Sequence, residues 1–373
     1  MMKHGLRLFL ALTVLLCAGI TAGATPEPVV IGQSLPLTGA GFSVANRVLA
    51  GAKAHVARVN ASGGILGRPV ELVTLDDGGD PKRVAANVRT LVRLHKATVI
   101  VNCLGEPACL AAAETTAELR VPLVGPMSGA LALRSREVRH VFSLRPEDDR
   151  EADALARQLH AIGISRVVLL ADEAEPARTL ALAAALRRAG MQITRLKAEA
   201  QPASIEAAFR GIAQAASQAL VLSLGNEVLE TLARLPVAAR EGIPSTIATL
   251  SSAGLTQVTH LFRDRMIGYT SVVPNPEVTH LPIVRELSRD ADAYIGPEAL
   301  SFEGLESYLT LRLCTEALRR TGPHVDGQRL GEAIENLGTL DLGGFRLTFG
   351  RERHHGSDYV EIGMRARDGR LLR

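Results

Sequence analysis

The sequence predicts an α/β protein with two lobes, each built on a parallel β-sheet that helices cover on both faces. Short apolar segments alternate with helix-like segments over most of the chain, and 373 residues exceed the usual size of one domain. Hydrophobic residues make up 47% of the chain and charged residues 22%, as in ordinary globular proteins. Disorder and a disulfide-dense mini-fold are therefore excluded as descriptions of the whole chain.

The first 24 residues are typical of a secretory signal peptide. Lys3 and Arg7 precede an apolar segment over 8–20, and Ala22-Gly23-Ala24 forms a cleavage signal before Thr25. An uncleaved anchor is the alternative, although this segment is short for a bilayer. We expect cleavage and export to the periplasm, and loss of Lys3 and Arg7 lowers the net charge from +3 to +1.

Strands and helices alternate through the first half of the mature chain. We expect strands at 29–31, 69–75, 98–101 and 121–124, helices with apolar faces over 48–59 and 84–92, and a further helix over 108–119. The segment 32–43, rich in Gly, Ser, Thr and Pro, is expected to be a loop. Asp80-Pro81 predicts a helix start, because Asp caps free N–H groups and Pro suits the first turn.

The same alternation continues in the second half. We expect helices at 148–162, 177–189 and 204–216, the last capped by Ser204, and strands at 167–170 and 219–224. Pro146, Pro274 and Pro276 interrupt the pattern and suit crossings between lobes.

Three cysteines follow the leader. Cys103 and Cys109 are six residues apart across a predicted strand-to-helix loop, so they either form a disulfide or remain two buried thiols. Cys314 lies among leucines and is expected in the core.

Catalytic and metal-binding signatures are missing. The sequence has no phosphate-binding glycine loop and no G-x-S-x-G elbow, and its only His pair, His354-His355, lacks metal-ligand spacing and is expected in a solvated loop. Trp is absent and aromatic residues make up 3%, which argues against nucleic-acid binding. We therefore expect no catalytic residues, no cofactor, no metal and no nucleic-acid partner.

Three loops follow predicted strands, where ligands bind in open α/β sheets. They are 105–108, which opens a helix, then 125–129 and 223–227. Helix N-termini present free N–H groups that favour anions. Each loop alone is equally consistent with ordinary turn chemistry, but the three together predict a ligand site.

Several segments resemble the leucine/isoleucine/valine-type periplasmic binding proteins, the solute receptors of ABC importers. The resemblance rests on 31–39 (IGQSLPLTG), 60–67 (NASGGILG), 76–81 (DDGGDP), 122–129 (PLVGPMSG) and 341–345 (DLGGF), in this order. It implies the type I periplasmic-binding fold, with two Rossmann-like lobes joined by a three-strand hinge. Together with the proline breaks, it implies one lobe from 25–145 and 275–349, and the other from 146–274 and 350–373.

The resemblance also implies where a ligand binds. In the amino-acid binders, first-lobe loops hold the ligand carboxylate, at positions that correspond to Gly105-Glu106 and 127–129. Their ammonium-binding acid corresponds to Ser251-Ser252, which cannot supply a charge, and Glu175 either replaces it or is an exposed loop acid. These departures argue against an ordinary α-amino acid. The candidate ligand-binding residues are Phe42, Gly105, Glu106, Pro107, Met127, Ser128, Gly129, Glu175, Asn226, Ser251 and Ser252.

The family resemblance implies a monomeric periplasmic receptor that passes a small organic ligand, such as an amino acid, amide or carboxylate, to an ABC permease. Such a protein catalyses no reaction. Closure of its lobes over the ligand provides the affinity and the surface that docks on the permease. A ligand sensor for a signalling partner is the alternative, and an exported enzyme is disfavoured by the missing motifs.

Overall fold

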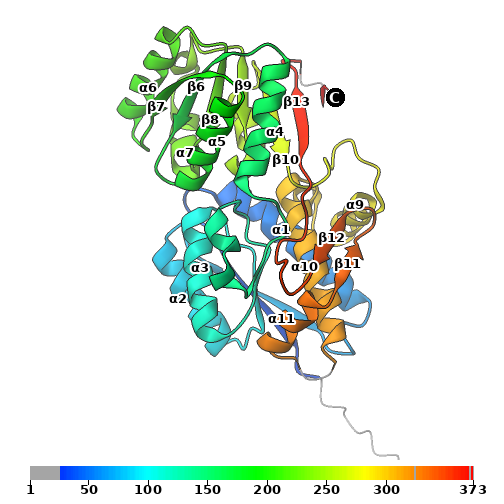
Figure 1. Cartoon of the computed structure of the whole chain (residues 1–373). Coiled ribbons are helices and arrows are strands. Elements are labelled where there is room, and N and C mark those ends of the chain that lie inside the picture. The colour runs from blue at the N-terminus through cyan, green and yellow to red at the C-terminus, as the bar shows by residue number, and fades with distance from the viewer. Residues whose placement is uncertain (1–25, 323–324, 369–370, 373) are drawn as a thin grey trace, which may run out of the picture.

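The computed structural model describes residues 26–322, 325–368 and 371–372. Figure 1 shows two lobes, one above the other, with the chain passing between them. The predicted signal peptide lies outside the described residues. None of the helices that the structure describes is long and apolar enough to cross a bilayer.

The first lobe is built on a five-stranded parallel sheet in the order β2-β1-β3-β4-β5. Its strands are β1 (Val29–Leu35), β2 (Val70–Asp76), β3 (Val99–Val101), β4 (Leu123–Val124) and β5 (Val141–Phe142). Its first helices are α1 (Phe42–Ala61), α2 (Pro81–Arg93) and α3 (Glu106–Leu119). Asp80 caps α2 as predicted, because its carboxylate accepts a hydrogen bond from the Lys82 amide at 2.8 Å.

The second lobe has a seven-stranded sheet in the order β14-β13-β10-β9-β8-β6-β7. Its strands are β6 (Arg166–Ala171), β7 (Gln192–Lys197), β8 (Ala219–Ser223), β9 (Thr246–Thr249), β10 (Met266–Ser271), β13 (Glu361–Arg365) and β14 (Leu371–Leu372). Its helices are α4 (Asp148–Ala161), α5 (Pro176–Arg188), α6 (Pro202–Gln214), α7 (Asn226–Arg234) and α8 (Leu255–Leu261). Only β13 and β14 pair antiparallel, which the sequence analysis does not anticipate.

A later segment of the chain returns to the first lobe. It consists of α9 (Pro282–Tyr294), α10 (Phe302–Arg320), α11 (Gly327–Glu335) and the hairpin β11 (Gly338–Asp341) and β12 (Arg346–Phe349). Tyr308 and Leu309 of α10 share one buried core with Ile31 of β1 and Val101 of β3. The chain therefore passes between the lobes three times, at 143–147, 272–281 and 350–360.

Two local predictions are wrong. β1 continues through Leu35 rather than ending at Ile31, because the polar Gln33 and Ser34 are buried and hydrogen-bonded across the sheet, to Thr74 and Asp77. α6 begins at Pro202, and Ser204 does not cap it. The Ser204 hydroxyl instead accepts a hydrogen bond from the Glu199 amide at 3.0 Å in the preceding loop.

The cysteine alternatives are now resolved. Cys103 and Cys109 form a disulfide with a Cα–Cα distance of 5.3 Å, which ties the loop after β3 to the first turns of α3. Cys314 is a free, fully buried thiol of α10, as predicted.

Candidate functional site

A cavity lies where the carboxyl ends of both sheets face each other across the lobe boundary. It encloses about 50 Å³, room for roughly four water molecules. Residues from both lobes and from the crossing segments line it: Val44, Leu104, Gly105, Met127, Arg145, Glu175, Arg178, Leu224, Gly225, Asn226, Ser251, Ser252, Gly254, Leu255, Thr270, Ser271, Val272, Val273, Phe302, Glu303 and Glu306. The site is therefore assembled only when both lobes are present and close together.

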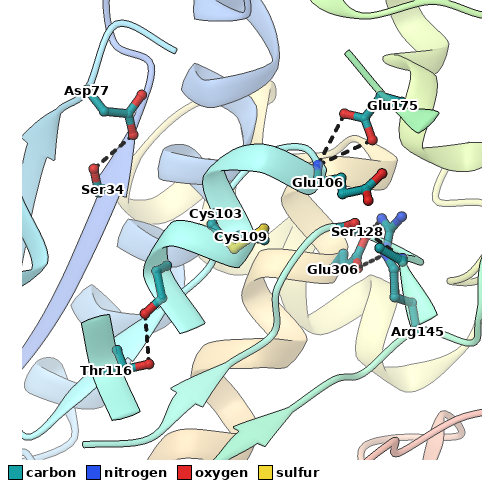
Figure 2. The surroundings of a disulfide bond; sticks show 12 residues. Ser34, Asp77, Cys103, Glu106, Cys109, Thr116, Ser128, Arg145, Glu175 and Glu306 are labelled. Carbon is teal, nitrogen blue, oxygen red and sulfur yellow. Dashed lines mark hydrogen bonds and ion pairs between the residues drawn. A yellow bond between two sulfur atoms is a disulfide. The ribbon is translucent and has the colours of Figure 1, made fainter. Parts of the chain in front are cut away.

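The N-termini of α3 and α5 meet at this cavity. A backbone amide of each helix N-terminus donates a hydrogen bond to a carboxylate from the other. The Glu106 amide, at the start of α3, donates to both carboxylate oxygens of Glu175, each at 3.2 Å. The Ala177 amide, in the first turn of α5, donates to Glu106 Oε2 at 3.1 Å. Figure 2 shows the Glu175 carboxylate facing the Glu106 amide from the opposite lobe. Each helix N-terminus, with its free N–H groups and positive dipole end, is thus satisfied by an acid of the other lobe.

Burial raises the pKa of Glu175 from its ordinary value. The nearby Arg178 guanidinium and the Glu106 amide oppose this shift, while the Glu106 and Asp172 carboxylates add to it. The carboxylate between the lobes is therefore costly to ionise, and the α3 amide offsets part of that cost.

A second contact joins the lobes at the rim of the cavity. The Gly41 amide, directly before α1, donates to Glu230 Oε1 of α7 at 3.0 Å. Gly41 has φ of 92°, and a side chain there would meet the Asn226 amide nitrogen at 2.9 Å. Glycine is required at this position both for the backbone conformation and for the close approach of the lobes.

Arg178 organises the second-lobe side of the cavity. Its fully buried guanidinium donates to Ser223 Oγ and Ser252 Oγ, both at 3.3 Å, and to the Leu224 carbonyl at 2.9 Å. One side chain from the first turn of α5 therefore holds the loops after β8 and β9 in place.

Arg145 and Glu306 form a buried ion pair at the base of the cavity. Arg145 comes from the first crossing segment, and its Nε and Nη2 donate to the two Glu306 oxygens of α10 at 2.8 and 2.6 Å (Figure 2). Both side chains are about 5% exposed or less. A bidentate pair of this kind neutralises both charges and fixes both side chains.

Two further buried acids differ in how they are satisfied. Glu151 of α4 accepts hydrogen bonds from the Ser251 amide, the Ser251 hydroxyl and Thr270 Oγ1. Asp148, the first residue of α4, has one carboxylate oxygen with no partner among the described residues. Burial raises the pKa of Asp148 to about 7, and the Glu151 carboxylate contributes to this increase.

No group of three or more His, Cys, Asp and Glu side chains is placed to hold a metal ion within the described ranges. His354 is mostly buried, contrary to expectation, whereas 31% of the His355 side chain is exposed. His354 stacks on Phe142 with ring centroids 4.7 Å apart and faces the Glu335 carboxylate, because the crossing segment that carries it packs against the first lobe.

A family model described as "Periplasmic binding protein" matches residues 28–369. The chain belongs to this family. An amino acid binding protein of Pseudomonas aeruginosa is 31% identical to it over 142 residues, 38% of each chain. The chain matches well under half the length of such curated relatives.

Solved structures resemble this periplasmic binding protein over nearly its whole length. A substrate-binding periplasmic protein from Ralstonia solanacearum has a TM-score of 0.82 and 26% identity, over 92% of this chain and 99% of that chain. A possible leucine/isoleucine/valine-binding protein from Rhodopirellula baltica has a TM-score of 0.83 and 22% identity, over 95% and 98%. These similarities confirm the predicted type I fold and the family resemblance.

The structure brings most of the predicted site residues of this periplasmic binding protein together. Six line the cavity itself: Gly105, Met127, Glu175, Asn226, Ser251 and Ser252. Glu106 lies at the contact between helix N-termini, and Pro107 lines an outer groove that adjoins the cavity.

The remaining three predicted residues also lie outside the cavity lining. Phe42 is the first residue of α1 rather than a loop residue, and 47% of it is exposed. The Ser128 hydroxyl is buried and accepts a hydrogen bond from the Ala130 amide at 3.3 Å. Gly129 packs against Asp148, whose carboxylate leaves no room for a side chain there. Local packing therefore turns these positions away from the enclosed space.

Four charged residues that line the cavity are not indicated by the sequence patterns, namely Arg145, Arg178, Glu303 and Glu306. Three of them lie on helices, where a charged residue usually faces solvent. For three of them, the sequence contains one hint, which is closeness to a helix N-terminus. Arg178 lies in the first turn of α5, and Glu303 and Glu306 lie in the first two turns of α10.

Proposed function

We propose that this periplasmic binding protein is a solute receptor that captures a small organic ligand between its lobes and delivers it to an ABC importer. The cavity carries the proposal, because its polar and apolar lining comes from both lobes and from the segments that cross between them. A ligand that touches both lobes favours the closed arrangement over the open one. The candidate ligand contacts are Gly105, Met127, Glu175, Asn226, Ser251 and Ser252.

The proposal includes the location and the partner. We infer a mature protein that begins near Thr25, resides in the periplasm as a monomer, and docks on an inner-membrane permease in its closed form. Membership of the periplasmic binding protein family supports this location. The lobes that move are inferred to be 25–145 with 275–349, and 146–274 with 350–373, since the shared cores and sheets follow that division.

We further infer that the protein performs no chemistry on its ligand. The polar groups at the cavity are mostly satisfied by one another, as in the Arg145–Glu306 pair and the Arg178 network. This arrangement suits binding more than proton transfer. A sensor role would use the same cavity and the same closure, with a signalling protein in place of the permease.

Native mass spectrometry of protein purified without refolding tests the proposal. We expect a retained small molecule, released on denaturation and unchanged after long incubation. Intact mass also tests the start of the mature chain. A protein that retains nothing, and that no compound in a broad small-molecule panel stabilises, would contradict the receptor function. Conversion of the retained molecule to a product would show an enzyme instead.

A further inference from the structure

Glu303 presents an unpaired carboxylate at the cavity. It lies in the first turn of α10 and is 8% exposed. Neither of its carboxylate oxygens has a hydrogen-bond partner among the described residues. Glu306, one turn further along the same helix, is by contrast fully paired with Arg145. A buried carboxylate without a partner is strongly disfavoured, so the position lacks a hydrogen-bond donor.

Neither of the two basic side chains that line the cavity forms an ion pair with Glu303. Three acids line the cavity, namely Glu175, Glu303 and Glu306, against the two bases Arg145 and Arg178. Arg145 is bound to Glu306, and Arg178 is bound to serine hydroxyls and a carbonyl. Burial raises the pKa of Glu303, and the residue's own backbone amide, Arg47 and Arg145 together offset only part of that shift. Acids therefore outnumber bases by one among the residues that line the cavity.

The binding place for a ligand carboxylate is already occupied. The backbone amide at the start of α3 is one of the groups in this cavity that suit an anion. It is bound to Glu175 from the other lobe. A ligand that carries its own carboxylate would have to displace Glu175 before it could use this helix.

We propose that the ligand is a small organic cation, a primary amine or related ammonium compound without a carboxylate, whose positive group binds the Glu303 carboxylate. This inference rests on the proposed receptor function and specifies its substrate class. The ligand's N–H groups would satisfy the two unpartnered oxygens, and its apolar part would lie against Val44, Leu255 and Phe302.

The surroundings of the cavity have the matching charge. The outer groove next to it is lined by six acids, Asp77, Asp172, Glu173, Glu175, Glu199 and Glu227, and by one base, Lys197. A cleft lined by one sign of charge concentrates ligands of the opposite sign and increases their association rate. The groove thus attracts cations towards the enclosed acid.

A matched set of three compounds tests the class of ligand. Valine, isobutylamine and isovalerate share the branched carbon skeleton and carry both charged groups, only the amine, or only the carboxylate. Titration calorimetry and thermal shift at pH 7 and low salt measure their binding. We expect isobutylamine to bind at least tenfold more tightly than valine, and isovalerate not to bind. Equal or tighter binding of valine or isovalerate would overturn the proposal.

Variants test the residue. Glu303→Gln keeps the shape and removes the charge, so it should weaken isobutylamine binding at least tenfold without lowering the melting temperature of the free protein. Glu303→Asp retains the charge but shortens the side chain by one methylene group, which moves the carboxylate away from the ligand. This variant should weaken binding by an intermediate factor. Glu316→Gln removes one charge from the exposed side of the same helix and should leave binding unchanged. Unaltered binding in a folded Glu303→Gln protein would show that Glu303 is not the cation partner.

Different experimental results would contradict the receptor function and the proposed cationic ligand. Failure of the receptor function leaves the protein without any retained or stabilising compound. Failure of the cation proposal leaves a bound compound that is anionic, neutral or zwitterionic, which native mass spectrometry identifies directly. A retained cation that Glu303→Gln no longer holds supports both.

Discussion

At the scale of single residues, we expect the buried carboxyl of Asp148 to make the stability of the protein depend on pH. Asp148 begins α4 next to the first crossing segment, and burial raises its pKa to about 7. An unfolded chain would ionise the same carboxyl near pH 4. The folded state therefore gains stability from the bound proton below pH 4 and loses it progressively as pH rises to 7.

Asp148→Asn should remove this loss. The variant cannot ionise, so the wild type should lose up to about 4 kcal/mol relative to it between pH 4 and pH 8. The measurement is the difference in melting temperature between the two proteins at each pH, with Asp149→Asn in the same helix turn as the control. A difference that does not change with pH would contradict the assigned titration.

The sequence predicted which residues line the cavity only where the course of the backbone alone brings them there. Asn226 follows a predicted strand, so its place at the sheet edge follows from topology, whereas Glu175 and Ser251 were placed by the family resemblance. Ser128 follows a strand as well, but its hydroxyl turns to the Ala130 amide. Glu303 lies on a helix, and only the packing of α10 turns it towards the cavity. The direction of a side chain depends on tertiary packing, which a strand-and-turn pattern does not contain.

At the scale of elements, the reciprocal hydrogen bonds between the N-termini of α3 and α5 connect the two lobes. We call this pair of contacts the latch and expect it to favour the closed arrangement. Hydrogen bonds to a charged acceptor contribute about 1.5–3 kcal/mol when buried. Glu175→Ala removes the acceptor for the Glu106 amide. We expect the population of the closed arrangement to fall roughly tenfold, since about 1.4 kcal/mol corresponds to that factor.

Distance measurements between spin labels on the two lobes check this expectation. Glu173→Ala is the matched control, because Glu173 lies two residues away and makes only an exposed ion pair with Lys197. Such a pair contributes little to stability. The latch is absent if Glu175→Ala and Glu173→Ala give the same distribution of distances.

Helices α1 and α10 approach closely because glycine faces glycine. A Cβ atom at Gly51 would lie 2.0 Å from the Gly304 carbonyl oxygen. Gly51→Ala should therefore destabilise the protein by about 1–3 kcal/mol through overpacking, which lowers the melting temperature of a protein this size by roughly 1–4 °C. Thermal unfolding followed by circular dichroism measures the change.

Gly331→Ala in α11 is the control for that substitution. Its added Cβ would meet only Phe142 ring atoms at 3.9 Å, an ordinary contact. Because glycine weakens a helix interior, this variant should be as stable as the wild type or slightly more so. The apolar face of α1 was predictable from its periodicity, whereas the glycine contact depends on which helix packs against it.

At the scale of the whole molecule, the sequence could indicate two lobes but not how they share the cavity. The alternation of strands and helices and the proline-bearing breaks predict the architecture. The placement of α10 against the first lobe, with Glu303 and Glu306 at the boundary, depends on the return of the chain after β10. Such long-range packing has no local signature in the sequence.

Ligand binding should close the two lobes and stabilise them together. A compound that binds only the folded, closed form stabilises it by RT ln(1 + [L]/Kd), about 2.7 kcal/mol at a hundredfold excess over Kd. For the compound that native mass spectrometry identifies, we expect the melting temperature to rise by several degrees and to increase linearly with the logarithm of concentration. Small-angle scattering on the same samples should show a smaller radius of gyration, because both lobes contribute to the cavity.

The two readouts separate closure from simple binding. A compound that occupies one lobe alone would raise the melting temperature without changing the radius of gyration, because the open and closed arrangements would bind it equally. Glu303→Gln should abolish both changes for a cationic compound while Glu316→Gln retains them, since Glu303 lines the cavity and Glu316 does not. A rise in melting temperature that survives Glu303→Gln, with no change in dimensions, would place the binding site outside the shared cavity.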